Sequence, residues 1–446
     1  MQPEHLRFGG GLSGTLVHPL TVVGIFVAVL FILILPRDKA IVPFLLGFFI
    51  VPLAQVLVIA GVHFTMLQVL ILAVLAKMVV SRQSLSGHKF PGGFNGIDKV
   101  VVLWSLSAFF VFCLQFPEMQ AWIKGLGDLL DLLGGYAAVR FLICDRDALY
   151  RTAKVLAVIC VIQGACMISE QFTGHNVFSF CGGPTPSVRD GHIRSEGSLG
   201  TLYGGVFAGV LLPLFIWLWS ESRAAAYAGI AGATAMVFAS HASTSWMAFG
   251  GSLAGLGFWP LRNKMRLVRW TLVVTLIGLH LVMHGPVWSL IEKVDLTGGS
   301  SSYHRYMLVD NCIRHFGDWW LMGCTYYGSW GFDMWDLCNQ FVAVALTGGL
   351  VSLFLFIAVY VKSFARIGSS RADVSGDHVQ EWLLWCLGSA LFANVVASFG
   401  INYMVQLMMC FSCLLACISV ATFEATQSAF ACAEAPVVER FDSAFA

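Results

Sequence analysis

Long apolar stretches that are nearly free of charge limit what this chain can fold into. Each is roughly 20 residues long, the length that an α-helix needs to cross the hydrocarbon core of a bilayer. They lie near 18–36, 40–59, 63–80, 100–116, 120–143, 152–170, 200–219, 224–240, 245–260, 268–286, 339–361, 381–399 and 401–421. The chain of 446 residues is 58% hydrophobic and only 11% charged, whereas soluble domains carry about 25% charged residues. The sequence therefore predicts an all-α, polytopic transmembrane protein with about 12–13 spans.

The composition also excludes several classes of partner. A formal net charge of +1 gives no indication of nucleic-acid binding. No long polar domain, low-complexity linker or internal repeat interrupts the chain, so residues 1–446 are expected to form one membrane domain. The first span resembles a signal sequence, but Pro36-Arg37-Asp38-Lys39 follows it in place of small residues, and we expect it to remain as an anchor.

The loops between the spans differ in positive charge. Most of the 26 Lys and Arg residues fall in one alternating set of loops, which is expected to be cytoplasmic because cytoplasmic loops are enriched in these residues. The segments 171–199 and 287–338 then face outside, and the tail 422–446 faces inside. Cys181, Cys312, Cys324 and Cys338 lie in the external segments and are able to pair, although spacing alone does not establish a disulfide.

The external segment 287–338 is much longer than a connection between two helices requires. Ser300, Ser301 and Ser302 are suited to cap a short helix over 303–316, and Gly317 is suited to end it. Aromatic residues follow at Trp319, Trp320, Tyr326, Tyr327, Trp330, Phe332 and Trp335. They fit either an interfacial aromatic belt or a platform on which sugar rings stack, and on the second interpretation Trp319 and Trp320 bind substrate.

Charged residues also occur within the spans. Asp128, Asp131 and Arg140 share one apolar segment, and such charges usually face a partner or a water-filled cavity because burial in lipid is costly. Arg140 is accordingly a candidate substrate-binding residue. The alternatives are a structural ion pair that fixes helix packing and, for Arg140, snorkelling to the interface. The thiols of the last span and the pair His280 and His284 indicate helix packing, and no metal site is predicted.

Two external arginines stand against the charge bias. Arg194 lies just before a span, and Arg305 opens the predicted loop helix. Their placement indicates an anionic partner, and a diphosphate fits because a guanidinium group grips two oxygens and stays charged. Contacts with lipid headgroups or surface salt bridges are the alternative.

At these residues the sequence resembles the O-antigen ligase and O-antigen polymerase superfamily of bacterial membrane glycosyltransferases. One set of matching features is the Arg-x-x-Gly of Arg194 and Gly197 before a span that contains Pro213, and the break His241-Ala-Ser-Thr-Ser245 between spans. The other set is Arg305, Gly323, and Asn339 followed by Gly348-Gly349.

The resemblance implies a GT-C-like fold in the bacterial inner membrane. It implies a metal-independent inverting glycosyltransferase without cofactor, which transfers a glycan from undecaprenyl diphosphate to a sugar acceptor during cell-envelope polysaccharide biosynthesis. Arg194 and Arg305 would stabilise the leaving diphosphate. Glu196, His304 and Asn339 would contribute to the substrate site.

One departure from the family bears on the general base. Many ligases have His before the Asn that corresponds to Asn339, whereas this chain has Cys338, and a thiol deprotonates poorly at neutral pH. We therefore assign the base to Asp336, with Glu196 and His304 as alternatives. The departure favours a polymerase or a divergent transferase over a strict ligase. A transporter or flippase for lipid-linked glycans and a non-catalytic relative in the same pathway are the competing hypotheses.

Overall fold

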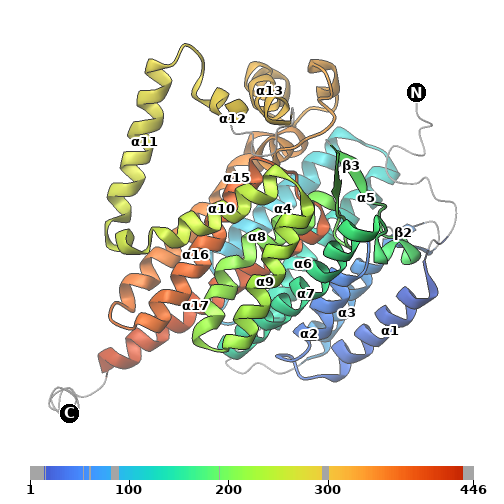
Figure 1. The fold of residues 1–446 in the computed structure, drawn as a ribbon, viewed down its shortest axis with the longest axis vertical. Helices are drawn as coiled ribbons and strands as arrows, with labels where there is room; N and C mark the ends of the chain where they lie inside the picture. The colour runs from blue at the N-terminus through green and yellow to red at the C-terminus, as the bar shows by residue number, and fades with distance from the viewer. Residues whose placement is uncertain are drawn as a thin grey trace.

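The chain folds into a bundle of tilted helices with two short β-hairpins and a helical cap at one end (Figure 1). The computed structural model describes residues 15, 17–53, 55–59, 62–81, 90–189, 191–293 and 301–434. Among these residues, seven helices are long and apolar enough to cross a membrane, and three shorter apolar helices accompany them. The expected all-α, polytopic membrane architecture is therefore supported at this level.

The first half of the bundle begins with helices α1 and α2, the hairpin β1–β2, and helices α3 and α4. A continuous helical segment follows, in which a π-helical turn joins α5 to α6, and the long helix α7 leads to the hairpin β3–β4. The bounds are α1 Pro19–Ile34, α2 Ile41–Ile50, β1 Val56–Ile59, β2 Val62–Thr65, α3 Met66–Val80, α4 Gly96–Gln115, α5 Met119–Leu129, the π-helix Leu130–Gly134, α6 Gly135–Leu142, α7 Arg146–Thr173, a 3₁₀ turn Val177–Cys181, β3 Ser187–Arg189 and β4 His192–Arg194.

The second half holds the helices that build most of the core and the cap. The bounds are α8 Thr201–Trp217, a 3₁₀ turn Leu218–Ser220, α9 Arg223–Ser240, α10 Ser243–Gly257, a 3₁₀ turn Trp259–Lys264, α11 Met265–Val282, a 3₁₀ turn Val287–Ser289, α12 Leu290–Lys293, α13 Ser301–Arg314, α14 Phe316–Trp319, a 3₁₀ turn Tyr327–Trp330, α15 Gln340–Asp373, α16 His378–Ser398 and α17 Val405–Glu434. The predicted tail 422–446 is thus helical as far as Glu434, and the rest of it lies outside the described residues.

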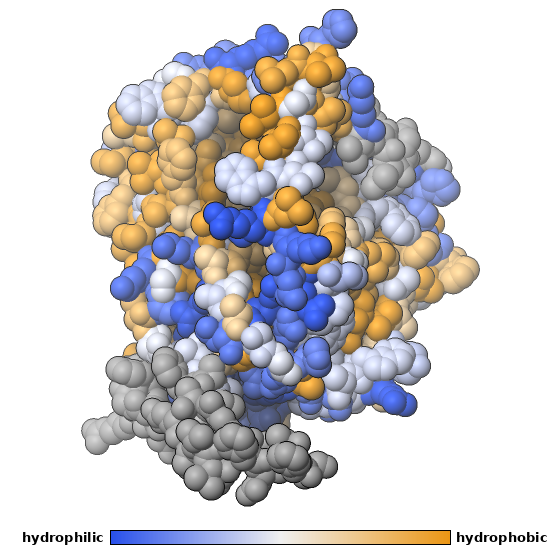
Figure 2. All heavy atoms as spheres, turned by 90° about the vertical axis from the view of Figure 1, so that its left-hand side faces the viewer, coloured by the Kyte–Doolittle hydropathy of each residue, from blue (hydrophilic) through white to orange (hydrophobic). Residues whose placement is uncertain are grey.

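Helices α17 and α11 differ most in how much of their surface is buried. The apolar window of α17 is 89% buried, and α17 packs against α15, α16, α6, α7 and α8. Helix α11 has no buried residue and stands away from the bundle in Figure 1. An apolar helix without protein neighbours is stable only where lipid surrounds it. Figure 2 shows a broad hydrophobic area over the upper left of one face, with hydrophilic side chains gathered near its centre and along its top edge.

The second expected span differs from the structure. Helix α2 ends at Ile50, and the chain continues as an antiparallel hairpin in which Val56 pairs with Thr65. The cause is local: Val51 precedes Pro52, which disfavours the helical region, and Val51 accordingly has an extended conformation with ψ 127°. The β-branched residues that follow are suited to strands.

The long segment 287–338 forms a helical cap over one end of the bundle. Helices α12 and α13 lie near the start of α15, at the top of Figure 1. The predicted helix 303–316 is found as α13, which ends at Arg314. Gly317 does not end it but lies within the short helix α14, and the predicted cap residue Ser300 lies outside the described residues.

The cap is fixed to the bundle through a break in α15. Gly349 has φ +69°, a left-handed conformation that strains most side chains, and this interrupts the helix. The backbone groups on either side of the break bond to the cap, because Cys324 N donates to Leu346 O (2.7 Å) and Leu350 N donates to Trp320 O (2.8 Å). A Cβ at Gly349 would lie 2.7 Å from Leu321 O, so only glycine allows this approach. The pair Gly348-Gly349 therefore positions the cap.

Candidate functional site

A cavity of about 810 Å³ lies beneath the cap. Its walls come from the β3–β4 hairpin, the starts of α8 and α10, the first turns of α13, and the segment that leads into α15. The lining residues are Arg189, His192, Arg194, Leu202, His241, Ser243, Trp246, Tyr303, His304, Arg305, Met307, Phe332, Asp333, Met334, Asp336, Cys338 and Gly400. Three arginines against two aspartates give this wall a positive balance, which suits an anionic ligand.

The backbone around Arg194 is held by a glutamine of α7. Gln171 Nε2 donates to Ile193 O (2.6 Å), Ser195 Oγ (3.0 Å) and Ala239 O (2.8 Å). Ser195 N also donates to Ala239 O (3.1 Å). These bonds tie the end of β4 to the end of α9, so Arg194 enters the cavity from a fixed support.

The glycine of the Arg-x-x-Gly motif, Gly197, allows a sharp turn of the backbone next to Arg194. The Glu170 carboxylate of α7 accepts the backbone N–H groups of Glu196 (3.0 Å) and Gly197 (3.1 Å), which turns the chain sharply. Gly197 has φ +57°, and a Cβ there would lie 2.7 Å from Gln163 Oε1. A side chain at this position would therefore displace the turn that supports Arg194.

Arg305 is nearly fully buried, and its side chain is held both by its own helix, α13, and by a hydrogen bond to α10. It lies on the second turn of α13, and its Nη2 donates to Thr244 Oγ1 at 3.0 Å. Thr244 lies in the first turn of α10, directly after the break between α9 and α10, and its hydroxyl donates to Gly400 O at 3.0 Å. The Ser-rich break that carries part of the family resemblance is thus a support for the arginine.

Asp336, His304 and Cys338 lie together on the wall formed by the cap. Cys338 Sγ donates to Asp336 Oδ2 (3.0 Å), and His304 Nε2 lies 2.8 Å from the Asp336 backbone oxygen. Burial and the Asp336 carboxylate raise the pKa of the Cys338 thiol to about 12, although Arg305 opposes this shift. The thiol is therefore protonated at neutral pH, whereas the carboxylate of Asp336 is exposed. Among the described residues, these three are also the group that can hold a metal ion.

Two histidines lie on the cavity wall beside Arg194. The rings of His192 and His241 stack at 5.1 Å between centroids, with an interplanar angle of 8°. Burial, His192 and Arg194 all lower the pKa of His241, so this ring is neutral near pH 7. Acidification adds positive charge beside Arg194.

The structure thus brings Arg194, Arg305, Asp336 and His304 to one cavity, whereas two other candidates lie behind its wall. Glu196 accepts from Thr201 N (2.9 Å) and from the Thr201 hydroxyl, which makes it a support for the start of α8. Asn339 is the N-cap of α15 and accepts from Phe341 N (2.9 Å) and Val342 N (3.1 Å). Neither side chain lines the cavity.

The two tryptophans proposed for sugar stacking are not part of this wall. Trp319 is buried, and its ring N–H donates to Cys312 O at 2.7 Å. Trp320 is exposed, but its backbone oxygen is bound to α15 and its ring does not line the cavity. The aromatic rings that do line the cavity are Trp246, Tyr303 and Phe332.

Arg140 lies at the opposite end of the bundle. Its Nε pairs with Asp98 Oδ1 at 3.2 Å, and both side chains are almost completely buried. Asp98 begins α4, whereas Gln115 at the other end of α4 bonds to Met322 of the cap. At 1.5 Å per residue this separation is about 25 Å. The structural ion pair, not substrate binding, therefore accounts for Arg140.

Several residues that line the cavity do not stand out in the sequence, among them His192, Trp246 and Tyr303. His192 lies two residues before Arg194, and Trp246 directly follows the Ser-rich break that ends at Ser245. Tyr303 directly precedes His304. Their closeness in sequence to the motifs is the only signal that points to them. The fold is needed to show which of the neighbouring side chains face the cavity. Cys181, Cys312, Cys324 and Cys338 are free thiols in the structure.

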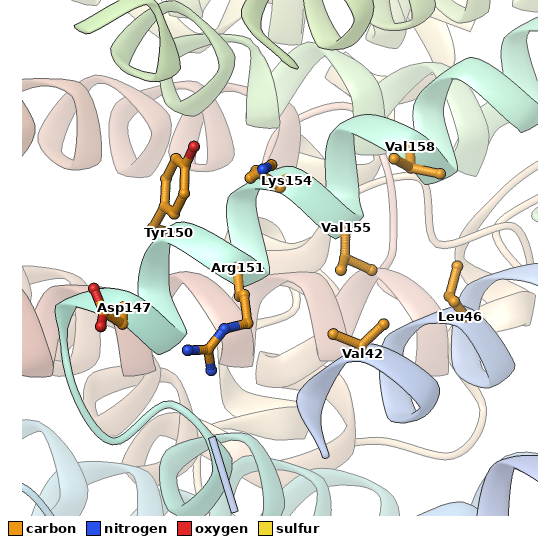
Figure 3. A pocket seen from close by; sticks show the side chains of 8 residues that line it. All are labelled: Val42, Leu46, Asp147, Tyr150, Arg151, Lys154, Val155 and Val158. Atoms are coloured by element: carbon orange, nitrogen blue, oxygen red, sulfur yellow. The ribbon is translucent and has the colours of Figure 1, made fainter. Parts of the chain in front are cut away.

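A second cavity, of about 560 Å³, lies between α2 and α7 (Figure 3). Its apolar wall includes Val42, Leu46 and Val155, and Arg151 lies at its polar end. Arg151 is already engaged, because its Nη1 pairs with Asp38 Oδ2 at 2.6 Å. This cavity contains none of the residues assigned to chemistry.

Compared with protein-family models and with curated protein sequences, the chain shows no match. The resemblance to O-antigen ligases and polymerases therefore stays a prediction from the motifs.

Proposed function

We propose that the cavity beneath the cap is the active site of a membrane glycosyltransferase that transfers a glycan from undecaprenyl diphosphate to a sugar hydroxyl. The observation that supports this most is the convergence of Arg194 and Arg305, from distant parts of the chain, on one cavity that also contains Asp336. Its volume lies within the range of about 300–1,000 Å³ that is usual for ligand sites.

The two arginines are suited to the leaving group. As the bond between the anomeric carbon and the phosphate oxygen breaks, negative charge grows on the diphosphate. Guanidinium groups already fixed by Thr244 and by the support around Arg194 stabilise this charge without reorganisation. Their permanent charge makes a divalent ion unnecessary for this step.

Asp336 is suited to activate the acceptor. The hydroxyl oxygen of the acceptor attacks the anomeric carbon, its proton passes to the Asp336 carboxylate, and the diphosphate leaves with the bonding electrons from the opposite side. This displacement inverts the configuration. Cys338 does not compete for the proton, because its thiol is protonated at neutral pH.

The reaction is tested with purified protein, an undecaprenyl-diphosphate-linked glycan and candidate sugar acceptors, in EDTA and without added metal. We expect glycan on the acceptor and an equal amount of released undecaprenyl diphosphate. Arg305→Ala is the control. Movement of the intact carrier lipid across proteoliposomes without any transfer would support the transporter hypothesis and contradict this proposal. Activity that EDTA abolishes and Mg²⁺ restores would contradict the role of the arginines.

A further inference from the structure

We propose that His304, Asp336 and Cys338 form a zinc site on the wall of the cavity, and that Zn²⁺ bound there inhibits the protein. The three residues come from two segments, the start of α13 and the loop before α15. One ligand atom of each lies within 4.8 Å of the others. The cluster borders the cavity, so an ion held there reaches the ligand space directly.

The kinds of ligand atom select the metal. A nitrogen, a sulfur and a single carboxylate oxygen suit Zn²⁺, whereas Mg²⁺ and Ca²⁺ require oxygen ligands. Bonds of about 2.0–2.3 Å to a tetrahedral Zn²⁺ place the ligand atoms about 3.3–3.8 Å apart. Cys338 Sγ and Asp336 Oδ2 are already 3.0 Å apart; the Asp336 side chain is exposed, and that of Cys338 is half-buried. Small rotations of the three side chains therefore complete the site.

Three protein ligands leave a fourth position of the ion open toward the cavity. Zinc displaces the proton of the thiol, and the resulting thiolate and carboxylate balance the two charges of the ion. Arg305 lines the same cavity and opposes a cation, so we expect a site that EDTA empties readily. Such a site is suited to reversible control.

Inhibition rests on the proposed function, because it requires Asp336 to be the base. A carboxylate bound to Zn²⁺ accepts a proton poorly, and an ion at this wall also fills the space of the acceptor hydroxyl. The binding itself requires no assumption about the reaction. Binding and inhibition are therefore measured separately.

Binding is measured by titrating EDTA-stripped, purified protein with Zn²⁺ in competition with a fluorescent zinc chelator. We expect one site, weakened at least tenfold by Cys338→Ser, His304→Ala or Asp336→Asn. Cys324→Ser and His315→Ala are matched controls in the same cap and should bind as the parent does. Co²⁺ should give a thiolate-to-cobalt absorption band that Cys338→Ser removes.

Binding that is the same in the parent and in Cys338→Ser, or no binding under these conditions, would overturn the zinc site. Inhibition is measured as glycan transfer with and without Zn²⁺, and the parent should lose activity that EDTA restores. Zinc that binds through Cys338 but leaves transfer unchanged would support the site, but it would overturn the proposed inhibition and contradict the base role of Asp336.

Discussion

Arg305 Nη2 donates a hydrogen bond to Thr244 Oγ1 at 3.0 Å. The bond joins the cap to the first turn of α10, and the Thr244 hydroxyl in turn donates to Gly400 O, between α16 and α17. A Cβ at Gly400 would lie 2.8 Å from the Thr244 side chain, so the three segments are closely fitted. The arginine is therefore held by the transmembrane bundle as well as by its own helix.

Thr244→Val is expected to lower kcat about tenfold with little change in KM, because a hydrogen bond to a charged group contributes roughly 1.5–3 kcal/mol. Thr244→Ser keeps the hydroxyl and should retain most of the activity. Both variants are compared in glycan transfer at matched abundance and matched melting temperature. A serine variant as impaired as the valine variant would mean that packing of the methyl group, not orientation of Arg305, is what matters.

Arg140→Gln is expected to destabilise the protein by about 3–5 kcal/mol, because it leaves the Asp98 carboxylate buried without its partner. Asp98→Asn combined with Arg140→Gln should recover part of this loss. Melting in detergent measures the stability of each variant. Specific transfer activity, measured per folded protein, should stay near the parent value; a large fall in activity with unchanged stability would return Arg140 to the substrate site.

His241→Asn is expected to reduce the sensitivity of the protein to acid. The pKa of His241 is lowered in the folded state, so the folded protein binds fewer protons than the unfolded chain between the two pKa values. Acidification from about pH 7.5 to about pH 5.5 therefore favours unfolding of the parent as His titrates near 6.5. Asparagine is chosen because His241 has φ +43°, which Asn tolerates. Equal shifts in melting temperature for both proteins would contradict the assignment.

The orientation expected from the positive charge of the loops predicts the reactivity of two introduced thiols. Thr325 of the cap and Ser369 of α15 are both exposed, and Cys338 is replaced first because it is accessible. Thr325→Cys should react with an impermeant thiol reagent added outside the cell, whereas Ser369→Cys should react only after permeabilisation. The opposite pattern would reverse the orientation and place the cavity on the cytoplasmic side.

The positions of the helices were predictable because apolar runs of sufficient length have few other structures in lipid. The hairpin after α2 is hidden in the sequence because the apolar run continues through it, and Pro52 is the one local signal that the helix ends there. Arg194 and Arg305 could be predicted as site residues because they carry positive charge in the loops that are otherwise poor in Lys and Arg. The partner of Arg140 could not be found, since Asp98 is 42 positions away and no periodicity relates them.

The central claim is that Arg194 and Arg305 act together on one diphosphate, and glycan transfer by their variants tests it most directly. Arg305→Ala should lower turnover about 10²–10³-fold, as is typical when one donor to a developing anion is lost. Arg305→Lys should recover part of this, because lysine keeps the charge but not the forked geometry. Arg194→Ala should behave similarly, and the double variant should be less than additive because both residues serve one group. At matched membrane abundance, transfer at the parent rate by both alanine variants would contradict the account.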